Sequence, residues 1–250
     1  MRIGCEGGGR RVSRVPTDLP RIKPVGDRAL LVTLGSGIDP AINAAVHRLA
    51  AQIDADPPTG VVTAVPAYCS LLVHHEPAAA DVAMIERSIT ALISKSEEPD
   101  AQPTAEGRLV EIPVCYGGRY GPDIEVVAST NRLSVDAVVA LHTSVDYRIY
   151  MIGFTPGFPY LGGLPAQLET PRLDTPRQRI PAGTVGIAGR QTGVYPIESP
   201  GGWQLIGRTP MRLFDPDKAD PVPYRAGDRI RFTAVSEGEF HRLSDRGTGP

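Results

Sequence analysis

The segment from Tyr150 to Thr209 constrains this chain more than any other, because glycine and proline recur through it at a density that regular helices and strands do not tolerate. It includes the runs TPGFPYLGGLP and GVYPIESPGGW, in a chain with 27 glycines and 25 prolines. Ordinary helices and strands exclude both residues, whereas tight turns and close backbone approaches require them. The segment therefore predicts a surface built from loops and short strands rather than part of a hydrophobic core.

Charge and cysteine content exclude several classes of protein. The chain has 26 lysines and arginines against 28 acidic residues, a formal charge of -2, so nothing in its electrostatics favours a nucleic-acid partner. Its three cysteines, Cys5, Cys69 and Cys115, are scattered without zinc-ligand spacing, so we expect no metal site and a reducing compartment. No apolar run approaches the about 20 residues that span a bilayer, and the first residues lack a signal-peptide core. We expect a cytoplasmic protein without a membrane partner.

Hydrophobic patterns over residues 21–94 predict a small α+β domain. A β-branched run is typical of a strand, and apolar residues three and four apart are typical of a helix. The expected order is strand, helix, two strands separated near Pro66, and helix, which describes an α+β sandwich. The segments are Ala29–Leu34, Pro40–Ile53, Gly60–His74 and Ala78–Ile93. Residues 1–20, rich in glycine and arginine, are expected to be a disordered arm.

The second part of the chain is predicted to be mainly β. Residues 95–107 are polar, contain proline and lack periodicity, as expected of a linker. A strand at Leu109–Val114 and two short helical patterns, Asp123–Ser129 and Ser134–Thr143, follow. After them only short strands separated by turns remain, which predicts a closed or sandwiched β domain over residues 108–236. These strands are Arg148–Ile152, Thr184–Ala188, Val194–Ile197, Gln204–Arg208 and Arg229–Val235. The polar residues 237–250 are expected to form a frayed tail.

Several long motifs in a fixed order resemble a known family. They are YGGRYGPDIEVVA, YMIGFTPGFPYLGGLP, IPAGTVGIAGRQTGVYPIESPGGWQLIGRTP and LFDP. The chain resembles, from about Arg21 to Val235, the family of prokaryotic 5-oxoprolinase B subunits, also called allophanate hydrolase subunit 1 or the sporulation kinase inhibitor type. The resemblance implies an α+β N-terminal domain followed by a cyclophilin-like β-barrel domain with a carboxyltransferase-like role.

The same resemblance implies a function that needs other chains. Family members act with a second carboxyltransferase-like subunit, the C-subunit type of 5-oxoprolinases, and often with a third, to couple ATP hydrolysis to the opening of 5-oxo-L-proline to glutamate. The alternatives are a non-catalytic regulator that binds and inhibits a sensor histidine kinase, and a subunit for urea or allophanate metabolism. The chain has neither a GxxxxGK[ST] loop nor a GxGxxG turn between a strand and a helix. ATP is therefore expected at a site shared with the partner, with the need for Mg unknown.

Arginines within or beside the loops are the predicted substrate- or phosphate-binding groups. A guanidinium fork holds a carboxylate or phosphate through two parallel hydrogen bonds. The pair Arg172 and Arg177 is the first choice, and the alternative is that such side chains bond loop carbonyls, Asp174 or Asp215. The further candidates of this class are Arg179, Arg190 and Arg208, together with Gln191 and Thr192, whose polar groups suit a lactam amide or a turn closing on its own backbone.

His142 is the predicted catalytic residue, because a neutral imidazole can act as a base on water or carry a proton to the leaving nitrogen. The alternative is a packed or capping histidine. Aromatic side chains of the loop region are predicted to line an apolar pocket with a few polar tips, as small-molecule sites usually are, and the alternative is core packing. These residues are Tyr150, Phe154, Phe158, Tyr160, Tyr195 and Trp203.

Overall fold

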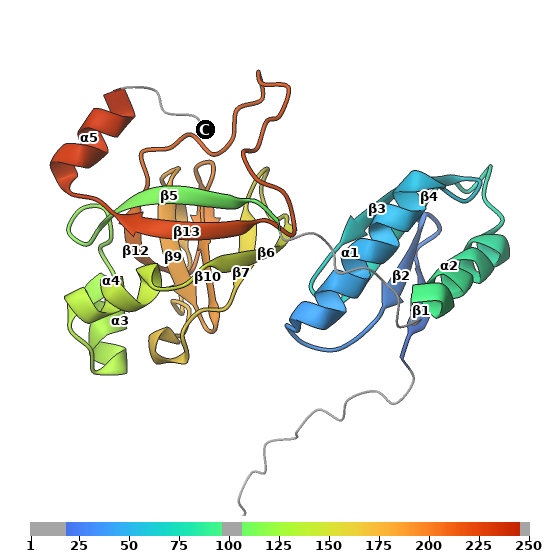
Figure 1. Ribbon diagram of the computed structural model, residues 1–250, viewed down its shortest axis with the longest axis horizontal. Coiled ribbons are helices and arrows are strands. Elements are labelled where there is room, and N and C mark those ends of the chain that lie inside the picture. The colour runs from blue at the N-terminus through green and yellow to red at the C-terminus, as the bar shows by residue number, and fades with distance from the viewer. Residues whose placement is uncertain (1–18, 97–106, 246–250) are drawn as a thin grey trace, which may run out of the picture. The chain divides into compact units, whose positions relative to one another are not determined.

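The computed structural model describes residues 19–96 and 107–245, and within them the chain forms two compact units (Figure 1). The first unit contains the chain up to Val65 together with Cys69–Ile93. The second unit contains Pro66–Tyr68 and the chain from Ser94 onward. Nearly all of the predicted arm and linker, residues 1–18 and 97–106, lies outside the described residues. No described helix combines the length and the apolar character that crossing a bilayer requires.

A four-stranded sheet and two helices form the first unit. The strand order is β1-β2-β4-β3, with β1 and β4 antiparallel to β2. Helix α1 begins after Asp39, whose carboxylate accepts hydrogen bonds from the backbone nitrogens of Ala41 (2.8 Å) and Ile42 (3.1 Å). The core lies between the sheet and the helices, with buried side chains from both. The elements are β1 (Arg21–Val25), β2 (Ala29–Thr33), α1 (Pro40–Ala55), β3 (Val61–Pro66), β4 (Ser70–His75) and α2 (Val82–Ser96).

Seven strands of the second unit close into a barrel in the order β10-β7-β6-β13-β5-β12-β9 (Figure 1). Strand β13 runs parallel to β5 and antiparallel to β6. The expectation of a mainly β second part is confirmed, and the barrel is closed. The strands are β5 (Leu109–Tyr116), β6 (Tyr147–Ile152), β7 (Pro159–Gly162), β9 (Thr184–Ala188), β10 (Gln191–Val194), β12 (Gln204–Arg208) and β13 (Arg229–Ala234).

Shorter elements complete the second unit. Strands β8 (Arg177–Ile180) and β11 (Ser199–Gly201) pair with each other, and a 3-10 turn, η1, spans Ala166–Leu168. Helices α3 (Ile124–Asn131) and α4 (Val135–Thr143) pack against β12 and β13. Their buried apolar residues join the inward-facing residues of the barrel strands in one core. This core holds the strand ends in place, and the loops between them carry the candidate site.

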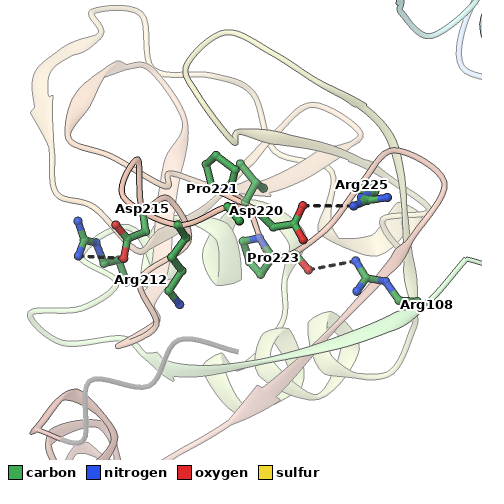
Figure 2. Close-up of a pocket in the computed structure, with 10 residues that line it drawn as sticks. Arg108, Arg212, Asp215, Asp220, Pro221, Pro223 and Arg225 are labelled. Carbon is green, nitrogen blue, oxygen red and sulfur yellow. Dashed lines mark hydrogen bonds and ion pairs between the residues drawn. The ribbon is translucent and has the colours of Figure 1, made fainter. Parts of the chain in front are cut away.

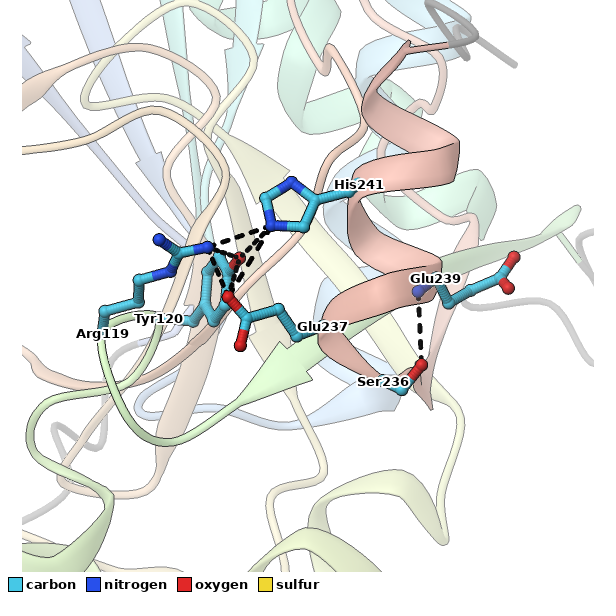
Figure 3. Close-up of polar contacts among 6 residues, drawn as sticks. All are labelled: Arg119, Tyr120, Ser236, Glu237, Glu239 and His241. Atoms are coloured by element: carbon cyan, nitrogen blue, oxygen red, sulfur yellow. Dashed lines mark hydrogen bonds and ion pairs between the residues drawn. The ribbon is translucent and has the colours of Figure 1, made fainter.

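The expectation of a frayed tail from residue 237 is wrong for its described part, because Glu237–Asp245 forms helix α5. Ser236 accepts a hydrogen bond from the backbone nitrogen of Glu239, and Phe240 is buried with its ring 4.6 Å from that of Tyr120. Around them, Figure 3 shows the Arg119 guanidinium in contact with the carboxylate of Glu237 and with His241. Only two apolar side chains, Phe240 and Leu243, occur in this polar nine-residue segment, which is too short a pattern for hydrophobic periodicity to indicate a helix.

Candidate functional site

The candidate site is a compact pocket of about 130 Å³ in the second unit. Phe158 and Tyr160 come from the start of β7, Tyr195 directly follows β10, and Trp203 stands between β11 and β12. Arg172 reaches the pocket from the loop after η1. Every lining residue belongs to the Gly/Pro-rich segment. Pockets for drug-sized ligands measure roughly 300–1,000 Å³, so this pocket admits only a compact molecule.

Phe158 is the centre of the aromatic wall. Its ring centroid lies 5.1 Å from that of Tyr160, 5.2 Å from that of Tyr195 and 5.5 Å from that of Trp203, with interplanar angles of 64°, 73° and 87°. Edge-to-face pairs of this kind add about 0.5–1.5 kcal/mol beyond the area that they bury. Phe158, Tyr195 and Trp203 are buried in one cluster, and Tyr160 is partly exposed beside it, so the wall is packed and preformed.

Two glycines let the rings approach the backbone. A methyl group on Gly201 would stand 2.5 Å from the hydroxyl oxygen of Tyr195, and one on Gly193 would stand 3.1 Å from the rings of Phe158 and Trp203. Contacts below about 3 Å force a shift in the neighbouring groups. The glycines that marked this segment in the sequence are therefore needed to bring the aromatic wall together.

Phe154 stands at the mouth of the pocket in a strained conformation. Its φ is 64°, its side chain is 61% exposed and its ring meets that of Phe158 edge to face at 5.6 Å. A bulky residue with positive φ is uncommon and costs about 1–3 kcal/mol, and such strain gathers at functional sites. The tight turn around it, with a 2.7 Å hydrogen bond from the Thr155 nitrogen to the Gly153 carbonyl, holds the ring out toward solvent.

Arg172 is the single cation that lines the pocket, and no carboxylate among the described residues forms an ion pair with it. Burial raises the pKa of Tyr160 and raises the pKa of Tyr195 to about 12, while the charge of Arg172 opposes both shifts. Both phenols therefore stay protonated at neutral pH, within the electrostatic influence of the Arg172 guanidinium. The pocket combines flat apolar walls, two hydroxyls and one free positive charge, which suits a small ring bearing a carboxylate.

Arg177 has a structural partner instead. Its guanidinium donates to the carboxylate of Asp123 at 2.7 Å, and the other carboxylate oxygen accepts from the backbone nitrogen of Leu205 at 2.7 Å. A further contact reaches the carbonyl oxygen of Trp203 at 3.4 Å. This network ties β8 and β12 to the start of α3. Sequence analysis did not select Asp123, and its only signal was an acidic residue directly before a helical pattern.

Replacing Asp123 with asparagine is expected to lower the free energy of unfolding by about 2 kcal/mol, because the half-buried guanidinium of Arg177 loses its counter-charge. Urea denaturation measures the change. The matched control is Glu198→Gln, which removes the exposed ion pair with Arg179 and should change stability by less than about 0.5 kcal/mol. Equal effects of the two variants would show that the Asp123 network has no special role.

The remaining predicted binding residues lie outside the pocket lining. Arg208 donates through Nε to the carbonyl of Ala182 at 2.8 Å, and Arg190 is exposed in the turn from β9 to β10. Gln191 is half-buried at the start of β10. Tyr150 is buried in β6, where a methyl group on Gly162 would meet its ring at 2.1 Å. Arg208 and Tyr150 therefore contribute to loop closure and packing.

His142 is fully buried in a chain of hydrogen bonds. Its Nδ1 lies 2.8 Å from the hydroxyl of Tyr116, and its Nε2 lies 2.8 Å from the hydroxyl of Thr192. Because the Thr192 hydroxyl donates to the carbonyl of Gly186, it accepts from His142, so the proton of the ring is on Nε2 and Tyr116 donates to Nδ1. Burial lowers the pKa of His142 to about 3. The imidazole is neutral, with both nitrogens engaged, and it does not line the pocket.

The volume of the pocket and its charged groups indicate which cofactors it can bind. At about 130 Å³ it is too small for a nucleotide, and a single arginine is its only charged lining group. Among residues 19–96 and 107–245, no three His, Cys, Asp or Glu side chains gather in a way that could hold a metal ion. The pocket thus fits a compact organic molecule and does not fit ATP.

Sequence comparisons connect this chain to known proteins. The family described as carboxyltransferase domain, subdomain C and D, matches residues 20–224. The chain is 42% identical to the 5-oxoprolinase B subunit of Bacillus subtilis strain 168, over 90% of this chain and 97% of that protein. It is 45% identical to the 5-oxoprolinase B subunit of Escherichia coli O157:H7, over 86% of this chain and 95% of that protein.

Solved structures agree in fold. The TTHA0988 crystal structure in space group P212121 superposes with a TM-score of 0.74 at 39% identity, over 84% of this chain, which spans only 40% of that longer chain. The urea amidolyase of K. lactis superposes with a TM-score of 0.77 at 20% identity, over 93% of this chain and 16% of that one. The second likeness concerns the fold alone. In both cases the matching region is one part of a larger polypeptide.

Proposed function

Because this chain belongs to the family of 5-oxoprolinase B subunits and carries carboxyltransferase subdomains C and D, we propose that it works as one subunit of an ATP-dependent 5-oxoprolinase, a hydrolase that opens the cyclic amide 5-oxo-L-proline to glutamate. The observation that carries the assignment to a site is the compact aromatic pocket with one cation, Arg172, which has no ion-pair partner within residues 19–96 and 107–245. We propose that it holds the substrate ring, with its carboxylate on Arg172 and its flat face against the aromatic wall.

The chemistry of the lining residues assigns this chain a binding role. The pocket is lined by aromatic residues, glycines and Arg172, and neither a carboxylate nor an imidazole is among them. Tyr160 and Tyr195 keep their protons at neutral pH because burial raises both pKa values, so they orient the lactam by hydrogen bonding. In this proposal the chain binds and orients the ring and excludes water from one side of it, while the proton-transfer groups come from another chain.

We propose that the other chain is a second carboxyltransferase-like subunit of the 5-oxoprolinase C-subunit type, with a third subunit in the full complex. The open mouth of the pocket, where the exposed Phe154 stands, is its proposed docking point. Support comes from TTHA0988, in which the region like this chain is about two fifths of a longer polypeptide. ATP has no place in the pocket, so its site is assigned to groups outside it.

We also propose a finer description of the architecture. The two compact units correspond to an α+β domain over residues 21–94 and a cyclophilin-like barrel domain over residues 108–236. The closed barrel and the separate sheet with its two helices support this division. The candidate site is built entirely by the barrel unit.

Binding of 5-oxo-L-proline is expected to change the fluorescence of Trp203, the only tryptophan in the chain, because its ring forms part of the pocket wall. A titration of the full chain should give a saturable change. The same titration with Arg172→Ala should require at least about tenfold more ligand, since a charge-assisted hydrogen bond is lost. L-proline, which has no lactam carbonyl, is the matched control ligand in this titration. A wild-type signal that does not saturate in the millimolar range would overturn the proposed substrate.

A further inference from the structure

A second pocket, of about 440 Å³, lies elsewhere in the barrel unit (Figure 2). The segment between β12 and β13 forms most of it, and Arg108 enters from the residue before β5. It shares no lining residue with the aromatic pocket. Nothing in the proposed handling of 5-oxoproline uses it.

Cations outnumber acids among the residues that line this pocket, although the whole chain carries a formal charge of -2. Two of its lining side chains are acidic, Asp215 and Asp220, and four are cationic, namely Arg108, Arg212, Lys218 and Arg225. Within the described residues, the Lys218 ammonium group has no ion-pair partner. A concave surface lined by several positive charges raises the local concentration of anions.

The carboxylate of the first acid, Asp215, stabilises the loop through contacts within it. Its carboxylate accepts from the backbone nitrogen of Asp217 at 3.2 Å and pairs with Arg212 at 3.2 Å. Its own backbone nitrogen donates to the carbonyl of Pro221 at 2.9 Å. Because its side chain is only 15% exposed, Asp215 shapes the pocket wall and presents little negative charge to a ligand.

The opposite end of the pocket is fixed by the buried carboxylate of Asp228. One oxygen accepts from the backbone nitrogen of Arg108 at 3.0 Å, and the other accepts from the backbone nitrogen of Arg225 at 2.9 Å. The Arg108 guanidinium also pairs with Asp228 at 3.2 Å, but its side chain is 66% exposed. Both arginines thus start from a rigid base, and Arg108 keeps an exposed face for a ligand. The ion pair between Arg225 and Asp220 is exposed on both sides, at 76% and 80%, so it is weak and a stronger anion can replace Asp220.

Figure 2 shows cationic side chains at two ends of this pocket. Arg212 lies with Asp215 at one end, Arg108 and Arg225 lie at the other, and Pro221 and Pro223 stand between them. We infer that this pocket binds an extended polyanion, a polyphosphate chain, whose successive phosphates meet the two ends. Guanidinium groups match phosphate oxygens bidentately, and an ammonium group such as that of Lys218 adds a point charge. A single small anion would reach only one end.

The test is calorimetric titration of the full chain with pyrophosphate and tripolyphosphate at low ionic strength. We expect saturable binding, tighter for the longer chain and weaker as salt is added. Lys218→Ala and Arg225→Ala should each weaken it about tenfold. The matched control is Arg242→Ala, which removes an exposed, ion-paired arginine of the same unit and should leave the affinity unchanged. Thermal unfolding checks that each variant is folded.

Further ligands separate the sources of such an anion. Binding of ATP as tight as that of tripolyphosphate would support a nucleotide held by its phosphates, and preference for tripolyphosphate would support free polyphosphate. Glutarate, a dicarboxylate, should bind at least about tenfold more weakly than pyrophosphate. Equal affinity for glutarate, no binding of any phosphate, or unchanged affinity in both variants would overturn the inference. These outcomes do not depend on 5-oxoproline, so the site and the proposed function can fail separately.

Discussion

Replacing Arg172 with alanine is expected to lower kcat/KM for glutamate formation from 5-oxo-L-proline by roughly 10²–10³-fold in the reconstituted complex. Arg172 is the only cation lining the aromatic pocket and has no ion-pair partner in the described residues, so it is the group available to the substrate carboxylate. Loss of one partner of a hydrogen-bonded charge pair in a desolvated site costs about 2–5 kcal/mol. Steady-state assays with the partner subunits present measure the change.

Two matched variants separate binding from folding in this experiment. Arg172→Lys keeps the charge but loses the fork, so an intermediate rate is expected. Arg242→Ala removes a 63% exposed arginine that pairs with Glu239, and it should retain wild-type activity. Full activity of a folded Arg172→Ala variant would contradict the assignment of this pocket to the substrate.

Replacing His142 with alanine is expected to lower the free energy of unfolding by about 3–5 kcal/mol. The substitution opens a cavity beside Phe232, whose ring stacks on the imidazole at 4.8 Å. It also leaves the hydroxyls of Tyr116 and Thr192 without a buried partner. Denaturant midpoints and slopes measure the loss. A change below about 1 kcal/mol would show that the hydrogen-bond chain contributes little to the core.

The same residue predicts a dependence of stability on pH. Burial lowers the pKa of His142 from 6.5 to about 3, so between these values the unfolded chain binds a proton that the folded chain does not. Its contribution is complete above pH 6.5 and is lost as the pH falls toward 3. His142→Gln, which can still donate to Thr192 but does not titrate, should therefore show a shallower decrease between about pH 7 and 4. Parallel curves for the two proteins would contradict a buried neutral imidazole.

The strands that could be predicted have an alternating or a continuous apolar pattern of their own, as β13 and β9 do. The expected segments Thr184–Ala188 and Gln204–Arg208 match β9 and β12, because every position of β9 and nearly every position of β12 is buried between two layers. Strand β10 was expected at Val194–Ile197 and lies at Gln191–Val194. Its position is set by pairing with β9, in which Gln191 faces Ala188, and no local pattern records a pairing of this kind.

The site was predictable in composition and less so in detail. The aromatic residues of the segment were recognised as a group, and Phe154, Phe158, Tyr160, Tyr195 and Trp203 line one pocket. Arg172 and Arg177 were indistinguishable in sequence, since both follow proline in the same loop. Only the contact of Arg177 with Asp123, 54 positions away, separates an arginine bound within the fold from one free for a ligand.

The central claim, that this chain supplies one half of a shared 5-oxoprolinase site, is tested most directly by the rate of glutamate formation from 5-oxo-L-proline and ATP. The rate is measured for the purified chain alone, for the second carboxyltransferase-like subunit with any third subunit, and for the mixture. The account predicts turnover in the mixture only, because the aromatic pocket binds the ring but carries no proton-transfer group. Turnover by the isolated chain at the rate of the mixture would contradict it.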